Sequence, residues 1–210
     1  YATAEHRWFL DENKNGRRVA EPALTKNLSP GQRLRNLFRC PVGKERGQVL
    51  RFGAMQGFVF GDGTKALGNR PGTVNVYDGK DEVFLPMFSA CCDVTYCPPD
   101  KNATGLSQNL GHHHFYGLPR GWKEVPSLKE SRSFLLGWLS GWFAADGCIS
   151  DNGQCVLNAA NQSHLEFARS VCAVLGIQCS PVRTQNRKGV NGEWSDLSAV
   201  TIYRGHLPVD

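Results

Sequence analysis

Two segments of the sequence share a spacing of small residues that restricts how the chain can fold. In each segment a small residue recurs every four positions: Gly53, Gly57 and Gly61 in the first, and Gly137, Gly141 and Ala145 in the second. Mostly apolar residues fill the positions between them, and an Asp-Gly pair follows directly. Four residues make about one helical turn, so the small residues line one face of each predicted helix. Faces without bulky side chains let two helix backbones approach closely, which predicts that the two helices pack side by side.

Each of these helices ends in an acidic residue, Asp62 in the first and Asp146 in the second. Close packing would bring the two carboxylates together, although they are 84 residues apart in sequence (146 − 62). Neighbouring carboxylates repel each other unless cations lie between them. Oxygen ligands of this kind hold Mg²⁺ against a phosphate. The sequence therefore predicts a divalent-metal site at Asp62 and Asp146.

The segments that follow the two helices come in the same order, which indicates a weak internal duplication. After the first helix, over residues 49–60, the pattern predicts strands at 73–77, 93–96 and 113–116 and a short helical segment at 82–88. After the second helix, over residues 133–145, it predicts strands at 155–157, 178–184 and 198–203. The last two strands would be joined by a polar hairpin over residues 186–196.

Local signals mark where the helices of the second half begin and end. Serine followed three residues later by glutamate is typical of a capping box, and it occurs at residues 127–130 and 163–166. The helix that begins at Ser163 carries one apolar face, and Gly176 is expected to end it. The residues of that face are Leu165, Ala168, Cys172 and Leu175.

The composition limits the class of binding partner and the cellular compartment that we expect. Lys and Arg outnumber Asp and Glu by 24 to 19, giving a net charge of +5, which mildly favours a polyanionic partner. No apolar run approaches the roughly 20 residues that cross a bilayer, and residues 1–7 lack the features of a secretion signal. We therefore expect a soluble intracellular protein of the cytoplasm, nucleoid or an organelle, with no membrane partner.

The eight cysteines raise the question of a zinc site. No Cys-x-x-Cys pair occurs, so the spacing does not favour one, and free thiols are the preferred interpretation. The candidates for the alternative would be Cys91, Cys92 and Cys97 with Cys40 or the run His112, His113 and His114.

The helix motifs resemble a known signature. The sequence Phe-Leu-Leu-Gly-Trp-Leu-Ser-Gly-Trp-Phe-Ala-Ala-Asp-Gly at residues 134–147 closely resembles that of LAGLIDADG homing endonucleases, and residues 55–64 resemble a first-repeat version. The resemblance implies an α+β fold of two pseudo-symmetric αββαββ(α) repeats packed through the motif helices. Antiparallel sheets would form a DNA-binding saddle. Residues 46–126 would be the first repeat and 127–210 the second.

The resemblance also implies an activity and its residues. The chain would be a monomeric endonuclease that hydrolyses phosphodiesters of double-stranded DNA at a long site with Mg²⁺ or Mn²⁺. Asp62 and Asp146 would bind the metals, with Gly61 and Ala145 at the adjoining backbone. Lys123, in Trp-Lys-Glu-Val-Pro, matches a lysine near the cleavage centre that would position water or stabilise phosphate charge. The candidates for DNA contact are Lys65, Arg70, Lys101, Arg183, Gln185, Arg187 and Lys188.

Two features depart from a complete family pattern. The second repeat ends at Asp210 without a closing helix or a counterpart of Lys123, which Arg204 or Lys188 would have to replace. At the front, Thr3 and His6 lie in a T-x-x-H sequence that resembles an intein splicing segment, here placed at residues 1–45. Because the chain begins at Tyr1 and lacks the terminal groups that splicing needs, we expect no splicing by this chain alone. An origin in an intein or a similar mobile genetic element is indicated.

Other functions fit parts of the same pattern. A non-cleaving DNA-binding protein of this fold, such as a maturase or transcriptional regulator, needs the sheets but not the metals, and the two aspartates argue against it. The chain is also compatible with the nuclease part of an intein, or with a splicing element whose nuclease half has lost its activity. A zinc-stabilised RNA-binding module is the alternative from an unrelated class, and stoichiometric zinc would identify it.

Overall fold

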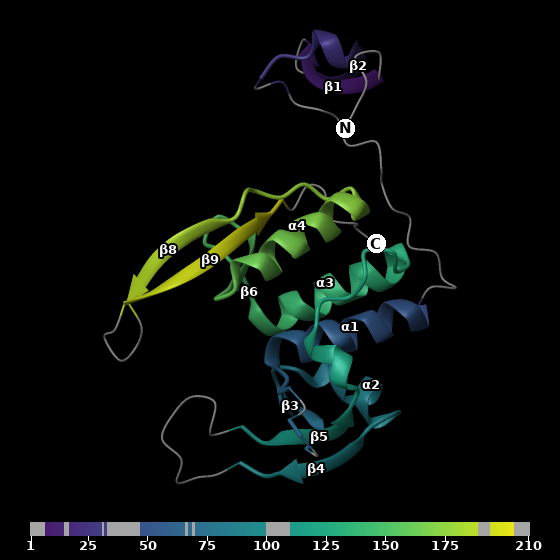
Figure 1. Ribbon diagram of the computed structural model, residues 1–210, viewed down its shortest axis with the longest axis vertical. Helices are drawn as coiled ribbons and strands as arrows, with labels where there is room; N and C mark the ends of the chain where they lie inside the picture. The colour runs from purple at the N-terminus through teal and green to yellow at the C-terminus, as the bar shows by residue number, and fades with distance from the viewer. Residues whose placement is uncertain are drawn as a thin grey trace.

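The computed structural model describes residues 7–14, 17–30, 32, 47–65, 67–68, 70–99, 110–188 and 194–203. Its centre is a pair of helices, α1 (Gly47–Asp62) and α3 (Arg132–Asp146), which lie side by side (Figure 1). One antiparallel sheet lies on each side of this pair (Figure 1). The fold is therefore α+β, with two repeats joined through the helix pair, as the sequence predicts.

Glycines bring the two helix backbones together, and they do so symmetrically. A Cβ atom added at Gly57 would collide with the backbone carbonyl of Trp138, and one added at Gly141 would collide with that of Ala54. The two contacts are equivalent, because the two glycines are 84 residues apart in sequence (141 − 57) and so are the two residues whose carbonyls they face (138 − 54). Gly53 and Gly137 repeat the relation one turn earlier. The predicted close packing is confirmed, and the contacts follow a twofold pattern.

The first repeat continues from α1 into a three-stranded sheet with the order β3-β5-β4. Its core is formed by the inward residues of the sheet, such as Val74, Val76 and Phe115, packed against Phe58 of α1 and Phe88. The elements are β3 (Gly72–Tyr77), η3 (Glu82–Phe84), α2 (Leu85–Ser89), β4 (Asp93–Cys97), β5 (His112–Leu118) and η4 (Arg120–Lys123). These elements match the predicted order of strand, short helix, strand and strand.

The second repeat continues from α3 into a four-stranded sheet with the order β6-β7-β9-β8. The predicted apolar face of α4 is confirmed, since all four of its residues are buried against this sheet and α3. Phe60 of α1 also packs into this second core. The elements are β6 (Gly147–Ile149), β7 (Cys155–Ala159), α4 (Gln162–Leu175), β8 (Arg183–Lys188) and β9 (Trp194–Ile202).

Both predicted capping boxes are wrong. The cap of α3 is Ser131, whose side chain accepts a hydrogen bond from the backbone N–H of Phe134 (3.2 Å). Ser127 instead accepts the backbone N–H of Lys129, which closes a turn before the helix. Helix α4 begins at Gln162, one residue earlier than predicted, because Asn161 caps it. Short polar side chains compete for these positions, and the four-residue pattern does not decide among them.

The strand prediction for residues 178–184 is also partly wrong. Residues 178–182 form no strand and pair only through an isolated bridge from Cys179 to Ile202, and β8 begins at Arg183. Pro181 lies between them and has no N–H to donate to a ladder. Strands β8 and β9 then extend into the predicted hairpin connection, with Lys188 opposite Trp194.

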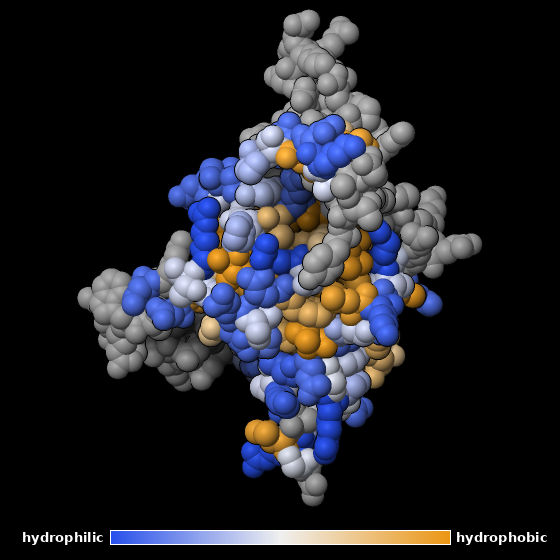
Figure 2. Space-filling view, turned by 45° about the horizontal axis from the view of Figure 1, so that its top comes forward, coloured by the Kyte–Doolittle hydropathy of each residue, from blue (hydrophilic) through white to orange (hydrophobic). Residues whose placement is uncertain are grey.

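The front of the chain forms a separate hairpin. Strands β1 (Arg7–Lys14) and β2 (Arg17–Leu24) pair antiparallel, followed by η1 (Thr25–Asn27). The face seen in Figure 2 is largely hydrophilic, with a group of hydrophobic residues near its centre. Within the described ranges, no helix combines the length and apolar character needed to cross a membrane.

Candidate metal centre

The structure brings Asp62 and Asp146 to the same end of the helix pair, because α1 and α3 end at these two residues. Gly61 makes room for the second carboxylate. A Cβ atom added there would lie 3.1 Å from Oδ2 of Asp146 and would collide with the Cβ of Ala145. The pKa of Asp62 is raised by its partial burial, which the charge of Lys80 opposes and the negative charge of Asp146 reinforces. The two carboxylates are thus close enough to repel each other.

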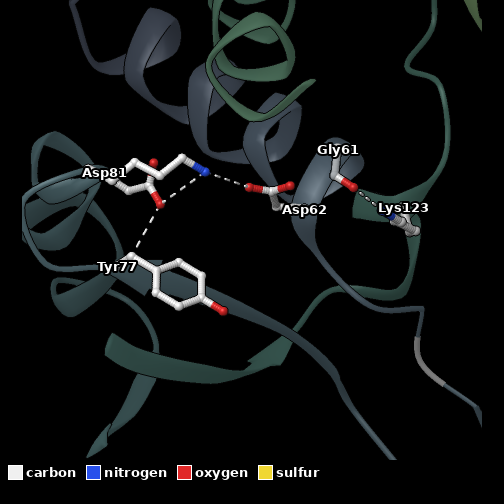
Figure 3. Close-up of polar contacts among 6 residues, drawn as sticks. Gly61, Asp62, Tyr77, Asp81 and Lys123 are labelled. Atoms are coloured by element: carbon white, nitrogen blue, oxygen red, sulfur yellow. Dashed lines mark hydrogen bonds and ion pairs between the residues drawn. The ribbon is translucent and has the colours of Figure 1, made fainter. Parts of the chain in front are cut away.

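Lys80 is a neighbour of Asp62 that the sequence analysis missed. Its ammonium nitrogen lies 3.9 Å from an oxygen of Asp62 and 3.9 Å from one of Asp81. Asp81 is buried and accepts a hydrogen bond from the backbone N–H of Tyr77 (3.4 Å). Asp81 and Tyr77 lie on one side of Asp62, and Lys123 lies on the other (Figure 3). Lys80 belongs to a turn after β3, where no motif marks it.

Lys123 closes the end of α1. Its ammonium group donates a hydrogen bond to the carbonyl oxygen of Gly61 (2.7 Å; Figure 3). It also donates to the carbonyl of Phe60 (2.6 Å), with that of Val59 at 3.4 Å. The carbonyls of Phe60 and Gly61 belong to the last turn of the helix, where backbone acceptors lack helical partners and carry partial negative charge, whereas that of Val59 also accepts the backbone N–H of Gly63 (2.8 Å). Burial lowers the pKa of Lys123, and the nearby charges of Asp146 and Asp62 oppose this shift. The lysine is therefore held beside the two aspartates by its hydrogen bonds to the end of α1.

Two aromatic side chains complete this end of the helix pair. The indole N–H of Trp142 donates a hydrogen bond to Oδ2 of Asp146, one turn along the same helix (2.8 Å). The imidazole of His164, near the start of α4, packs edge-to-face against Phe60 at 5.0 Å between ring centroids. Partial burial lowers the pKa of His164, and the positive charge of Lys123 adds to this. Neither contact follows from a sequence motif, because each depends on side-chain placement.

The available donors fit a hard divalent cation that also binds a phosphate. The centre offers two carboxylates, and no group of three or more His, Cys, Asp and Glu side chains suited to a metal occurs among the described residues. Mg²⁺ is commonly bound by one or two protein carboxylates, with waters and substrate phosphates as its other ligands. Two carboxylates therefore provide the protein ligands that it needs. The carbonyl of Gly61, a candidate ligand, already accepts a hydrogen bond from Lys123. The seven described cysteines are free thiols.

The candidates for DNA contact are distributed over both repeats. Lys65 follows α1, is exposed and lies 3.7 Å from Glu124, and Arg70 is exposed in the same loop. Arg183 is exposed at the start of β8. Three further candidates lie in β8, where the structure gives their backbone alone, namely Gln185, Arg187 and Lys188. The remaining predicted positions lie outside the described residues, namely Lys101, Thr3, His6 and Arg204.

The outward face of the first sheet is rich in polar and aromatic side chains. The strand register places His114 between Asn75 and Thr95, and His112 between Tyr77 and Cys97. The ring of His114 is hydrogen-bonded to the side-chain oxygen of Asn75 (2.7 Å). His113 points the other way and lies 3.4 Å from Asp78. The three consecutive histidines therefore do not gather around one point.

Comparisons with known proteins give similarity in structure only. No family model matches the sequence, and no curated protein matches it. A structure of mesophilic variants of the homing endonuclease I-DmoI aligns with 77% of this chain and 92% of its own, at 11% identity and a TM-score of 0.46. I-DmoI in complex with DNA and Mn aligns with 74% and 90%, at 13% identity and 0.46.

The N-terminal LAGLIDADG domain of DUF199/WhiA also has a similar structure. It aligns with 81% of this chain and 82% of its own, at 11% identity and a TM-score of 0.49.

Proposed function

We propose that this chain is a divalent-metal-dependent endonuclease that hydrolyses phosphodiester bonds of double-stranded DNA. The observation that carries the proposal is the meeting of Asp62 and Asp146 at the end of a glycine-lined helix pair, beside the half-buried ammonium of Lys123. Partial burial and mutual repulsion make two unneutralised carboxylates costly at this position. A bound cation and a phosphate would relieve that cost, which gives the arrangement a chemical purpose.

Each residue of the centre has a distinct part in this mechanism. The oxygens of Asp62 and Asp146 would hold Mg²⁺ or Mn²⁺, which when bound activates water and offsets the charge on the phosphate. Lys123 contributes a positive charge that is fixed in place by the carbonyls of α1, so it can stabilise the phosphate without reorganising. Lys80, held near Asp62, adds a second positive charge on the other side.

The two sheets supply surfaces for a long DNA site. Alternating residues point outward along each strand, and polar side chains there can reach base edges and phosphates. The first sheet offers Asn75, Thr95 and His114, and the second offers the arginine-bearing strand β8. Because one chain carries both repeats, a monomer would cover both halves of the site. We infer that the target is the insertion site of a mobile element, such as an intein, inside the cell that hosts it.

The test is cleavage of a supercoiled plasmid that carries the insertion site without the mobile element. With Mg²⁺, wild-type protein should linearise the plasmid, whereas Asp62→Asn or Asp146→Asn should reduce cleavage below detection. Binding measured in Ca²⁺ should persist in both variants. Asp151→Asn, in an exposed turn, is the matched control and should cleave normally. Full cleavage by both Asp62→Asn and Asp146→Asn would contradict the mechanism. If the wild-type protein bound the DNA without cleaving it, the non-cleaving alternative would be favoured.

A further inference from the structure

We propose that Trp142 is a positioning residue of the metal centre, which holds the carboxylate of Asp146 in one orientation by its indole N–H. This inference rests on the proposed function, because it assigns Trp142 to a carboxylate that binds metal. The hydrogen bond from Nε1 to Oδ2 measures 2.8 Å. It engages one oxygen of the carboxylate and leaves Oδ1 for a cation. Groups that orient a metal ligand in this way commonly change metal affinity by about 10- to 100-fold when removed.

The indole ring is well placed to fix a direction. Trp142 is 1% exposed, and its ring packs edge-to-face against Phe60 (4.9 Å) and at a tilt against Trp138 (5.2 Å). A Cβ atom added at Gly61 would lie 3.2 Å from Cδ1 of the ring. The ring is thus enclosed by α1 and by its own helix. Since the ring has little room to rotate, the N–H points at Asp146 without any adjustment when a ligand arrives.

The first repeat holds its aspartate by a different device. The residue that corresponds to Trp142 through the shift of 84 is Phe58, which is fully buried and stacked on Phe84 at 4.2 Å. A phenylalanine ring has no N–H to donate. Asp62 instead has Lys80 at 3.9 Å, a side chain that is 55% exposed. One carboxylate is therefore oriented by a buried, directional donor, and the other lies near an exposed charge.

A purely structural role for this hydrogen bond would be the satisfaction of a buried indole. Trp138 shows that burial in the same helix pair does not ensure such a partner. It is 0% exposed, and among the described residues its Nε1 has no hydrogen-bond partner. The two tryptophans lie one turn apart on α3, in the same core. They differ in that Trp142 reaches the metal-site carboxylate, which makes Trp138 a matched control.

The first experiment compares Trp142→Phe with Trp138→Phe, since both changes remove an indole N–H and keep an aromatic ring. We expect Trp142→Phe to raise the Mg²⁺ concentration for half-maximal plasmid cleavage by about 10- to 100-fold. Saturating Mg²⁺ should restore most of the rate. Trp138→Phe should leave the Mg²⁺ requirement within about twofold of wild type, whatever it does to stability. An equal Mg²⁺ requirement in the two variants would overturn the proposal while leaving the endonuclease function intact.

A second measurement needs neither cleavage nor a stable variant at position 142. In ¹⁵N-labelled wild-type protein, the indole N–H signal of Trp142 should change its chemical shift on titration with Mg²⁺ alone, and that of Trp138 much less. Asp146→Asn should abolish the response, and Asp151→Asn should preserve it. An unresponsive Trp142 signal in a protein that cleaves DNA would also overturn the proposal. Failure of the wild type to cleave DNA would count against the proposed function, not against this assignment.

Discussion

The two repeats are almost identical where they meet and differ increasingly with distance from that contact. Along α1 and α3, each close approach of a glycine to a carbonyl in one helix has a counterpart in the other. Beyond the helices, α4 has 14 residues and α2 has 5. Strand β6 pairs with β7 over three residues, whereas after α1 a single bridge joins Thr64 to Thr73. The positions where the two helix backbones touch tolerate almost no change of residue, whereas elements far from this contact can differ greatly in length.

The largest expected effect tests the symmetry of the helix contact. Gly57→Ala and Gly141→Ala should each destabilise the protein by about 3 kcal/mol or more, because the added Cβ would collide with a backbone carbonyl that cannot rotate away. The two losses should agree closely, as measured by urea unfolding. Gly121→Ala is the control, since a Cβ there meets nothing within 4 Å. A clear inequality between the two variants would show that the helices do not pack as equivalents.

A smaller effect tests the closure of α1 by Lys123. Lys123→Met should cost about 1–3 kcal/mol, because carbonyls at the end of α1 lose charged hydrogen bonds. Hydrogen exchange should quicken in the last turn of α1 more than in the last turn of α3. Lys65→Met, at an exposed lysine, should change stability by less than about 0.5 kcal/mol. If Lys123→Met quickened hydrogen exchange equally in the last turns of α1 and α3, Lys123 would not stabilise the end of α1 specifically.

The smallest effect concerns Asp62 in the metal-free protein. Its raised pKa means that ionisation is less favourable in the folded chain than in the unfolded one. The contribution of this group to stability is therefore present below the ordinary Asp pKa and is lost as pH rises through the raised value. Asp62→Asn should stabilise the chain at pH 7 by less than about 1 kcal/mol, since the side chain is 32% exposed.

Urea unfolding in EDTA measures this gain at pH 7 and at about pH 3.5, near or below the ordinary Asp pKa, where most of it should be absent. Asp151→Asn, in an exposed turn, should show little difference at either pH. A gain from Asp62→Asn that did not depend on pH would point to packing and not to ionisation.

Much of this architecture can be predicted from sequence because helix packing depends on a local pattern. The small residues at positions 53, 57 and 61 and at 137, 141 and 145 define both the faces that meet and the end where the aspartates lie. The N-caps of α3 and α4 were missed because neighbouring Ser and Asn residues compete for them. The contacts of Lys80 and Trp142 with the two aspartates could not be predicted for another reason. They depend on side-chain rotamers and on the conformation of a turn, and neither produces a periodic pattern in the sequence.

The placement of Phe60 has a consequence for how the protein is made. This residue of α1 is buried among residues of the second repeat, and Ala145 of α3 packs against the core of the first. On the ribosome, α1 emerges 84 residues ahead of the helix that covers it (146 − 62). At about 5–20 residues per second, that interval lasts roughly 4–17 seconds. For that time the earliest central helix exposes an aromatic, glycine-lined face, so the nascent chain would be most open to chaperones and to aggregation just before α3 arrives.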